Sequence, residues 1–211
     1  PRATQHVHEM IEAVKKILEN GYAYERNGSV YFDVMKFHKD HGYATMSGMD
    51  VEELETDASG RVGEELEEKK SPLDFALWIK AEPEHLMKWE SPWSVGYPGW
   101  HLECSVMSTK YLGKPFDIHT GGVDHIFPHH PNERAQNYSI YGMKEEPVHY
   151  WLHAEFINVK GEKMSKSKGN VVNPIKMTEK YGTDQFRYFL IKQKSVGKDG
   201  DFSERQLALR I

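Results

Sequence analysis

The sequence is short of the features that mark secreted, membrane and disulfide-bonded proteins. Its 211 residues include one cysteine, Cys104, so no internal disulfide can form, and we expect a cytoplasmic protein. No run approaches the roughly 20 apolar residues of a membrane span, and no charged-then-apolar leader is present. An initiator methionine is also missing, because the chain starts at Pro1, and we expect a segment of a longer protein.

A general excess of positive charge is absent as well. The net charge of −5 argues against a general nucleic-acid binder. Most of the acidic excess lies in residues 50–70, which carry a net −6 and are most simply a solvated face. Residues 141–211 carry a net +4, so this part of the chain is either an ordinary solvated surface or a face for a polyanion.

The hydrophobic periodicities predict an α/β protein with crossovers long enough for parallel strands. Helices are predicted over 7–18, 100–112, from near 131, over 174–181 and over 183–194. Strands are predicted over 22–24, 30–32, 75–79, 116–119 and 156–159. The pair Asn27-Gly28 predicts a hairpin turn between the first two strands. The remaining predictions are irregular structure over 36–72, with helical stretches at 50–55 and 63–70, and a rigid connector over 89–100.

A lysine-rich segment, Glu162-Lys-Met-Ser-Lys-Ser-Lys-Gly-Asn170, follows the last predicted strand. Lys163 and Lys166 are three apart, with small serines around them and Gly161 and Gly169 on either side. Such a loop can close over a polyphosphate and stabilise the charge that develops as pyrophosphate leaves. Taken alone, a lysine-rich stretch of this kind more often indicates a flexible basic surface loop.

Cys104, His129 and Glu133 are candidate metal ligands. His129 and Glu133 are four apart, so on a helix they share one side, and Pro131 between them requires that the helix is just beginning. Cys104 shares a predicted helix face with Trp100, Met107 and Tyr111. A thiolate, an imidazole and a carboxylate are plausible zinc ligands. Spacing alone favours structural roles for Cys104 and His129.

Several separated segments resemble one family. Residues 162–170 contain the KMSKS motif of class I aminoacyl-tRNA synthetases. Residues 98–105 (PGWHLECS) and 117–133 (DIHTGGVDHIFPHHPNE) resemble segments of cysteinyl-tRNA synthetases, as do residues 1–6 and 71–78. The resemblance runs from residue 1 to about 190. It implies an α/β fold: the second half of a class I Rossmann-type nucleotide-binding fold with an inserted mixed α+β connective region.

The resemblance also implies roles for individual residues. Cys104, His129 and Glu133 would hold a zinc ion that binds the thiol of the substrate cysteine. The residues of the amino-acid pocket would be Trp100, His101 and His119. In the nucleotide site, Gly122 and Asp124 would contact ATP, and the catalytic lysines Lys163 and Lys166 would act on its phosphates, with Mg²⁺ as the accompanying ion. A soft thiolate binds zinc far better than a hydroxyl does, so such a site would need no editing step.

The implied domains are residues 1–95, holding the end of the first half-fold and the insertion, residues 96–160, the second half-fold, and residues 161–211, the KMSKS loop with the start of the stem-contact helices. The parent protein would activate cysteine with ATP and transfer it to tRNA(Cys), as a monomer. The family's fourth zinc ligand and its HIGH motif do not occur here, so we expect the segment to be inactive alone.

Two departures from the family pattern leave alternatives open. Pro131 stands where a glutamate is usual, and Lys198-Asp-Gly-Asp-Phe-Ser203 resembles methionine-type synthetases more than cysteine ones. The alternatives are a methionine-type synthetase, a cysteine ligase with a sugar-amine acceptor, and a non-catalytic fragment that binds tRNA or a protein.

Overall fold

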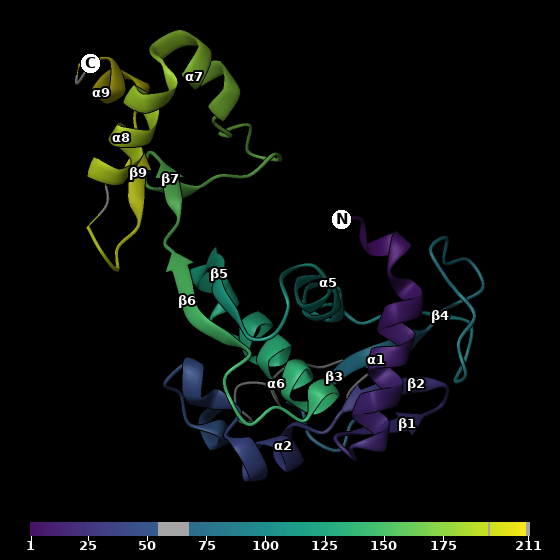
Figure 1. Cartoon of the computed structure of the whole chain (residues 1–211). Helices are drawn as coiled ribbons and strands as arrows, with labels where there is room; N and C mark the ends of the chain where they lie inside the picture. The colour runs from purple at the N-terminus through teal and green to yellow at the C-terminus, as the bar shows by residue number, and fades with distance from the viewer. Residues whose placement is uncertain (55–67, 194, 210–211) are drawn as a thin grey trace. The chain divides into compact units, whose positions relative to one another are not determined.

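The computed structural model describes residues 1–54, 68–193 and 195–209. The chain forms two compact units (Figure 1): unit 1 comprises Pro1–Thr120 and Asp124–Leu152, and unit 2 comprises Gly121–Val123 and His153–Ile211. The domain boundaries at residues 95 and 160 stay predictions. None of the helices in the described ranges combines the length and the apolar character that a bilayer crossing requires.

Unit 1 contains a four-stranded antiparallel sheet. The strands lie in chain order: β1 (Ala23–Arg26), β2 (Ser29–Phe32), β3 (Phe75–Lys80) and β4 (Gly96–Pro98). Asn27 and Gly28 both have positive φ, 51° and 86°, as a two-residue hairpin turn requires, so the predicted hairpin is confirmed. The predicted connector over 89–100 is wrong in part, because β4 lies within it and pairs with β3.

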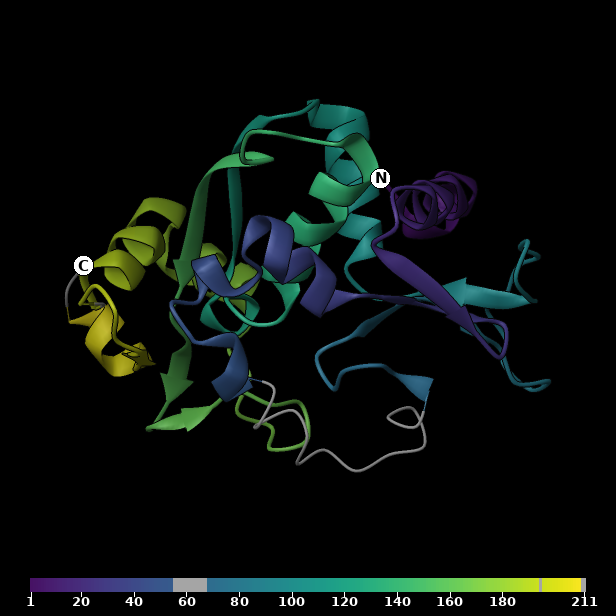
Figure 2. The same ribbon diagram turned by 90° about the horizontal axis from the view of Figure 1, so that it is seen from below.

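Three helices of unit 1 pack on one another: α1 (Val7–Glu19), α5 (Leu102–Leu112) and α6 (His129–Tyr141) (Figures 1 and 2). The apolar stripe of α1 is buried as predicted, with Met10, Val14 and Ile17 fully so. A short 3-10 turn, η1 (Ala3–Gln5), precedes it. The prediction that Trp100 lies on the same helix as Cys104 is wrong. His101 has a φ of 86°, a value that a right-handed helix does not allow, so α5 begins at the next residue, Leu102.

The segment predicted to be irregular contains a helix, α2 (Val34–His41), followed by the turn η2 (Ala44–Met46). The side chain of Asp33 accepts a hydrogen bond from the backbone N–H of Lys36, which caps the helix, and Gly42 ends it with a φ of 70°. Residues 51–54 are helical, in line with the prediction over 50–55. Most of the stretch predicted helical over 63–70 lies outside the described residues.

A two-stranded sheet joins β5 (Phe116–Gly122) and β6 (Val148–Ala154), with α6 between them in the chain. The sequence predicted the start of β5 but ended it before Thr120, whereas the strand continues to Gly122 and the turn η3 (Val123–His125) follows. β6 was not predicted.

Unit 2 has its own sheet and core. β7 (Ile157–Val159) lies between β8 (Glu162–Lys163), which is antiparallel to it, and β9 (Gly200–Phe202), which is parallel. α7 (Pro174–Tyr181) and α8 (Thr183–Gln193) match the predicted ranges closely, and β9 and α9 (Glu204–Ala208) were not predicted. The buried residues of this core are Phe186, Phe189, Phe202 and Leu207.

Candidate metal and substrate site

The first turn of α6 positions two of the candidate ligands. The helix begins at His129, so Pro131 falls in its first turn, where the missing N–H has no intrahelical partner to lose. His129 and Glu133 lie one turn apart on the same side, and both are buried. All residues of α6 from His129 to Ile140 are buried, so the two side chains are held by the packing on every side of the helix.

Helix α5 brings in the third ligand. The candidate ligand atoms of Cys104, His129 and Glu133 all lie within 4.8 Å of one another, and Cys104 is half-buried. Zinc binds sulfur at about 2.3 Å and nitrogen or oxygen at about 2.0–2.2 Å, so one ion can reach all three atoms after small side-chain adjustments. The structure therefore brings together the three residues that the sequence singled out as metal ligands.

The contacts within this group suit a cation. Glu133 Oε1 is buried and accepts no hydrogen bond among the described residues, although His129 Nε2 lies 2.9 Å away in an ion-pair contact. The two atoms are close without being aligned for a hydrogen bond, as two ligands of one ion can be. Burial raises the pKa of the Cys104 thiol to about 12, and Glu133 and Glu103 raise it further. A cation would reverse this effect and hold the thiolate.

His119 contacts the same carboxylate from β5. Its Nε2 lies 2.8 Å from Glu133 Oε2, at hydrogen-bond distance. The rings of His130 and Trp151 flank it, with centroids 4.6 and 5.0 Å from the His119 ring. His119, His130 and Glu133 form a second group whose candidate ligand atoms lie within 4.8 Å of one another. Sequence reasoning missed His130, which follows His129 directly, and Trp151, which lies in β6.

Trp100 and His101 lie in the turn between β4 and α5. Trp100 is 62% exposed, and its ring centroid lies 4.6 Å from that of His129. His101 is buried, and its Nδ1 lies 2.5 Å from His129 Nδ1. Burial lowers the pKa of His101 to about 3, and the neighbouring His129 contributes to the shift. All three residues predicted to line an amino-acid pocket, Trp100, His101 and His119, thus lie around the candidate metal ligands.

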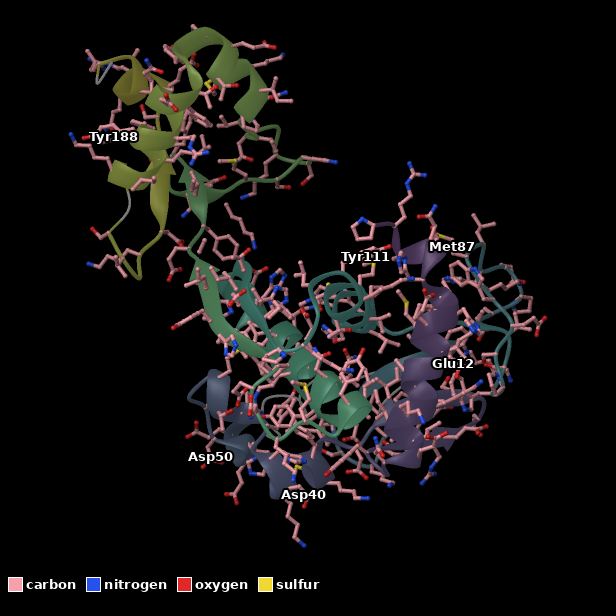
Figure 3. All side chains as sticks on the ribbon, in the orientation of Figure 1. Glu12, Asp40, Asp50, Met87, Tyr111 and Tyr188 are labelled. Carbon is pink, nitrogen blue, oxygen red and sulfur yellow. The ribbon has the colours of Figure 1, made fainter. Side chains whose placement is uncertain are left out.

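A hollow of about 340 Å³ lies beside α5 and is lined by one of the candidate metal ligands, Cys104. Cys104 and His119 line it together with apolar groups of α5 and β5, among them Met107, Ile118 and Tyr111 (labelled in Figure 3). Tyr111 is 57% exposed and Ile118 54%, which leaves apolar surface open to a ligand or to further polypeptide.

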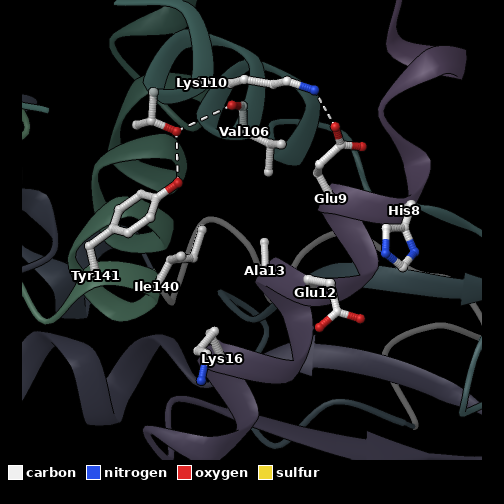
Figure 4. A pocket seen from close by; sticks show the side chains of 10 residues that line it. His8, Glu9, Glu12, Ala13, Lys16, Val106, Lys110, Ile140 and Tyr141 are labelled. Carbon is white, nitrogen blue, oxygen red and sulfur yellow. Dashed lines mark hydrogen bonds and ion pairs between the residues drawn. The ribbon is translucent and has the colours of Figure 1, made fainter. Parts of the chain in front are cut away.

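A larger hollow of about 420 Å³ lies between α1, α5 and α6 (Figure 4). Two pairs of its polar groups contact each other: the Lys110 ammonium pairs with Glu9, and the Thr109 hydroxyl lies 2.8 Å from the Tyr141 hydroxyl. It contains neither of the candidate metal groups, so its size gives no reason to prefer it as the reactive site.

The lysine-rich loop lies in unit 2, between β8 and α7. It is closed by Asn170, which accepts a hydrogen bond from the Ser165 N–H (2.8 Å) and donates one to the Lys163 carbonyl (3.2 Å). The Lys163 ammonium lies 4.0 Å from the centre of the Phe156 ring, and Lys168 pairs with Glu162 at 3.1 Å. Lys166 is exposed.

The two predicted nucleotide-binding residues follow one another closely in the chain. Gly122 is the last residue of β5, and Asp124 lies in the turn η3. Gly122 is counted with unit 2 and Asp124 with unit 1. Their roles stay predictions.

Comparison with known proteins identifies the class. Residues 1–210 match the family of class I (C) tRNA synthetase catalytic domains, and the chain belongs to this family. The fold agrees: a methionyl-tRNA synthetase of Mycobacterium tuberculosis, in complex with methionyl-adenylate, superposes with a TM-score of 0.69 at 20% identity over 100% of this chain and 50% of that one. This likeness establishes the fold alone.

The relatives by sequence are cysteine–tRNA ligases. The enzyme of Pyrococcus horikoshii is 50% identical over 98% of this chain, and that of Phocaeicola vulgatus is 46% identical over 98%. The resemblance to cysteinyl-tRNA synthetases is thereby confirmed. The chain spans 41% and 43% of the length of these two curated relatives.

Proposed function

We propose that this chain supplies part of the catalytic domain of a zinc-assisted, ATP-dependent ligase that activates cysteine as an adenylate and transfers it to tRNA(Cys). The observation that carries the proposal is the convergence of Cys104, His129 and Glu133, buried or half-buried, within 4.8 Å. The relatives, which are cysteine–tRNA ligases, support it. We further propose that the full-length enzyme is cytoplasmic and monomeric.

The metal would select the substrate. Zinc, when bound, would favour a soft thiolate ligand over a hydroxyl and so distinguish cysteine from serine. Cys104, His129 and Glu133 would hold it. His119 would keep Glu133 oriented through its 2.8 Å contact with Oε2, and the exposed ring of Trp100 would cover the side chain of the bound cysteine.

The chemistry on ATP would rest on positioning and charge. The cysteine carboxylate attacks the α-phosphate, pyrophosphate leaves, and the terminal ribose of tRNA(Cys) then takes the acyl group from the adenylate. We assign Gly122 to close approach of the adenosine and Asp124 to the ribose hydroxyls. Lys163 and Lys166 would stabilise the charge on the departing pyrophosphate, with Mg²⁺ as the counter-ion that accompanies ATP.

Zinc analysis of the 211-residue chain tests the metal assignment. We expect weak, partial zinc occupancy after dialysis, with water or a buffer anion as a further ligand, because three protein ligands can bind zinc but surrounding groups strongly affect affinity. Cys104→Ser should remove the zinc. Met107→Leu, on the same face of α5 and in the same hollow, should leave it unchanged. Stoichiometric zinc that survives Cys104→Ser would contradict the proposal.

The full-length enzyme gives the second test. Cysteine-dependent pyrophosphate exchange should fall sharply in Cys104→Ser, with KM for cysteine rising, and should persist in Met107→Leu. Equal rates of pyrophosphate exchange in Cys104→Ser and Met107→Leu would contradict the proposal that Cys104 helps to select the thiol of the substrate.

A further inference from the structure

We propose that His101 is a positioning residue for the metal ligand His129. It would accept a hydrogen bond from His129 Nδ1 and thereby keep His129 Nε2 deprotonated and directed at the metal. The inference rests on the zinc site of the proposed function and adds to it a residue that touches neither metal nor substrate.

The contact between the two rings defines the arrangement. The Nδ1 atoms of His101 and His129 are 2.5 Å apart, and both side chains are buried. At this distance one nitrogen must donate and the other accept, because two bare lone pairs would repel each other. The contact therefore requires that one of the two Nδ1 atoms carries a proton and the other does not.

The other side of His129 indicates which ring donates. His129 Nε2 lies 2.9 Å from Glu133 Oε1, yet that oxygen accepts no hydrogen bond among the described residues. If Nε2 carried the proton, Glu133 Oε1 would be close enough to accept it, but the N–H would not point at that oxygen and would make no hydrogen bond. A proton on Nδ1, donated to His101, satisfies one ring nitrogen and leaves the other with a lone pair for the metal. Metal-binding histidines generally have their second nitrogen held in this way.

The surroundings of His101 keep its ring in place. The Trp100 ring stacks on it at 4.7 Å and 27°, and the Phe75 ring meets it edge-on at 5.9 Å and 85°. Only 6% of the residue is exposed, so the ring has little access to a bound amino acid. We infer that His101 acts through His129 and not on the substrate directly.

The backbone at this position supports a role for the side chain. His101 has a φ of 86°, in the region that glycine adopts without strain and histidine rarely does. Packing of the chain alone would favour glycine or asparagine there. Strained backbone of this kind concentrates at functional sites, and here it accompanies a buried contact with a metal ligand.

Two variants of similar size separate the hydrogen bond from the packing. In asparagine, Oδ1 is attached to the same carbon position as Nδ1 in histidine, so His101→Asn retains an acceptor beside His129. His101→Leu places a methyl group there. Both variants lose the ring that stacks on Trp100, but asparagine tolerates the φ of 86° better than leucine does. His101→Gly, which adopts this φ without strain and offers no acceptor, is therefore the control for the backbone: it should behave like His101→Leu if the hydrogen bond matters, and like His101→Asn if only the backbone does. The measurements are zinc affinity of the 211-residue chain, by competition with a chelator, and the absorption spectrum of its Co²⁺ form.

We expect His101→Leu to weaken zinc binding by about 10- to 100-fold and to change the Co²⁺ spectrum, as loss of a partner of a metal ligand does. His101→Asn should retain the wild-type spectrum and most of the affinity. Equal loss in both variants, or no loss in either, would overturn the inference while leaving the zinc site itself intact. If the wild-type chain bound no metal and Cys104→Ser behaved identically, the zinc site and this inference would fall together.

Discussion

The two candidate reactive regions of the chain, the group of candidate metal ligands in unit 1 and the lysine loop of unit 2, are built in opposite ways. The metal group of unit 1 lies on regular helices, and His129 and Glu133 are buried and make short contacts with His101 and His119. The lysine loop of unit 2 lies outside regular structure for most of its length, and its backbone is held by Asn170 while Lys166 is exposed. One region orients side chains through packing, and the other orients the backbone and leaves a charge in solvent.

The difference corresponds to the two tasks proposed for them. Discrimination between cysteine and serine depends on ligand atoms held at fixed positions, which buried helices provide. Stabilisation of a leaving pyrophosphate needs a cation that can approach a polyphosphate, which a long exposed side chain provides. Variants of the metal ligands should therefore change zinc affinity, and variants of the lysine loop should change the rate of cysteine activation.

The largest effect is expected within the lysine loop. In the full-length enzyme, Lys166→Ala should lower the rate of cysteine activation by about 100- to 1,000-fold, the scale of losing one group that stabilises developing charge. Lys168→Ala should have a small effect, because Lys168 lies beyond the motif and already pairs with Glu162. Pyrophosphate exchange measures both. Comparable rates for the two variants would contradict the assignment of the loop.

A core variant of unit 2 tests whether the two regions can be altered separately. Leu207 is fully buried, and Leu207→Ala should lower the free energy of unfolding by about 2–5 kcal/mol, measured by urea denaturation. Leu209→Ala, at a residue 75% exposed, should change it by less than about 0.5 kcal/mol. Under native conditions neither variant should alter zinc affinity. A loss of zinc binding with Leu207→Ala would show that the two regions are coupled.

Among the candidate metal ligands, Glu133→Gln should weaken zinc binding by at least about 10- to 100-fold. That is the effect of losing a residue that only hydrogen-bonds to a ligand, and Glu133 is proposed as a ligand itself. The amide keeps the size of the side chain and can still accept from His119, so the change removes mainly the negative charge. Glu145→Gln, at an exposed position, serves as the control. Chelator competition decides the point, and unchanged affinity in Glu133→Gln would exclude it as a ligand.

The smallest effect concerns the ion pair between Arg134 of α6 and Glu146, which lies between α6 and β6. Arg134 is buried and binds Glu146 through two contacts of 2.8 Å. Burial raises the pKa of Glu146, but Arg134 outweighs it and lowers the pKa overall. The pair therefore stabilises the fold fully above the ordinary glutamate pKa, and its contribution is lost as pH falls through the lowered value. Glu146→Gln should cost about 1 kcal/mol at pH 7.

Denaturation at several pH values checks this prediction. The difference in unfolding free energy between wild type and Glu146→Gln should shrink at low pH, where Glu146 of the wild type is protonated and as neutral as the glutamine of the variant. A difference that does not depend on pH would mean that the charge of Glu146 contributes nothing.

The sequence predicts an element most reliably where a single local pattern decides its structure. The apolar stripe of α1 and the Asn27-Gly28 turn each decide their element, and the structure agrees. The spacing of His129 and Glu133 likewise predicted a shared side, and the position of Pro131 predicted the start of the helix.

The sequence predicts least where contacts between distant parts of the chain decide the structure. Helix α6 buries Asn132, Gln136 and Asn137, polar residues that no amphipathic pattern assigns to a core. The strand β6 alternates only weakly, and its pairing with β5 depends on residues far away in the chain. The contact of His101 with His129 spans 28 positions, so spacing could not reveal it. The metal assignment itself needed the family resemblance, because spacing favoured a structural Cys104.

The turn that precedes α5 has a consequence for anyone who edits this protein. Gly99 donates a hydrogen bond to the Leu77 carbonyl of β3 at 2.9 Å, and a Cβ atom on Gly99 would lie 1.8 Å from the Ala76 carbonyl oxygen. Helix α5, and Cys104 with it, is thus anchored at its start to strand β3 of the four-stranded sheet. A shortened protein in which a linker replaced that sheet would retain Cys104, His129 and Glu133 in its sequence and lose the contact that sets the position of the Cys104 thiol.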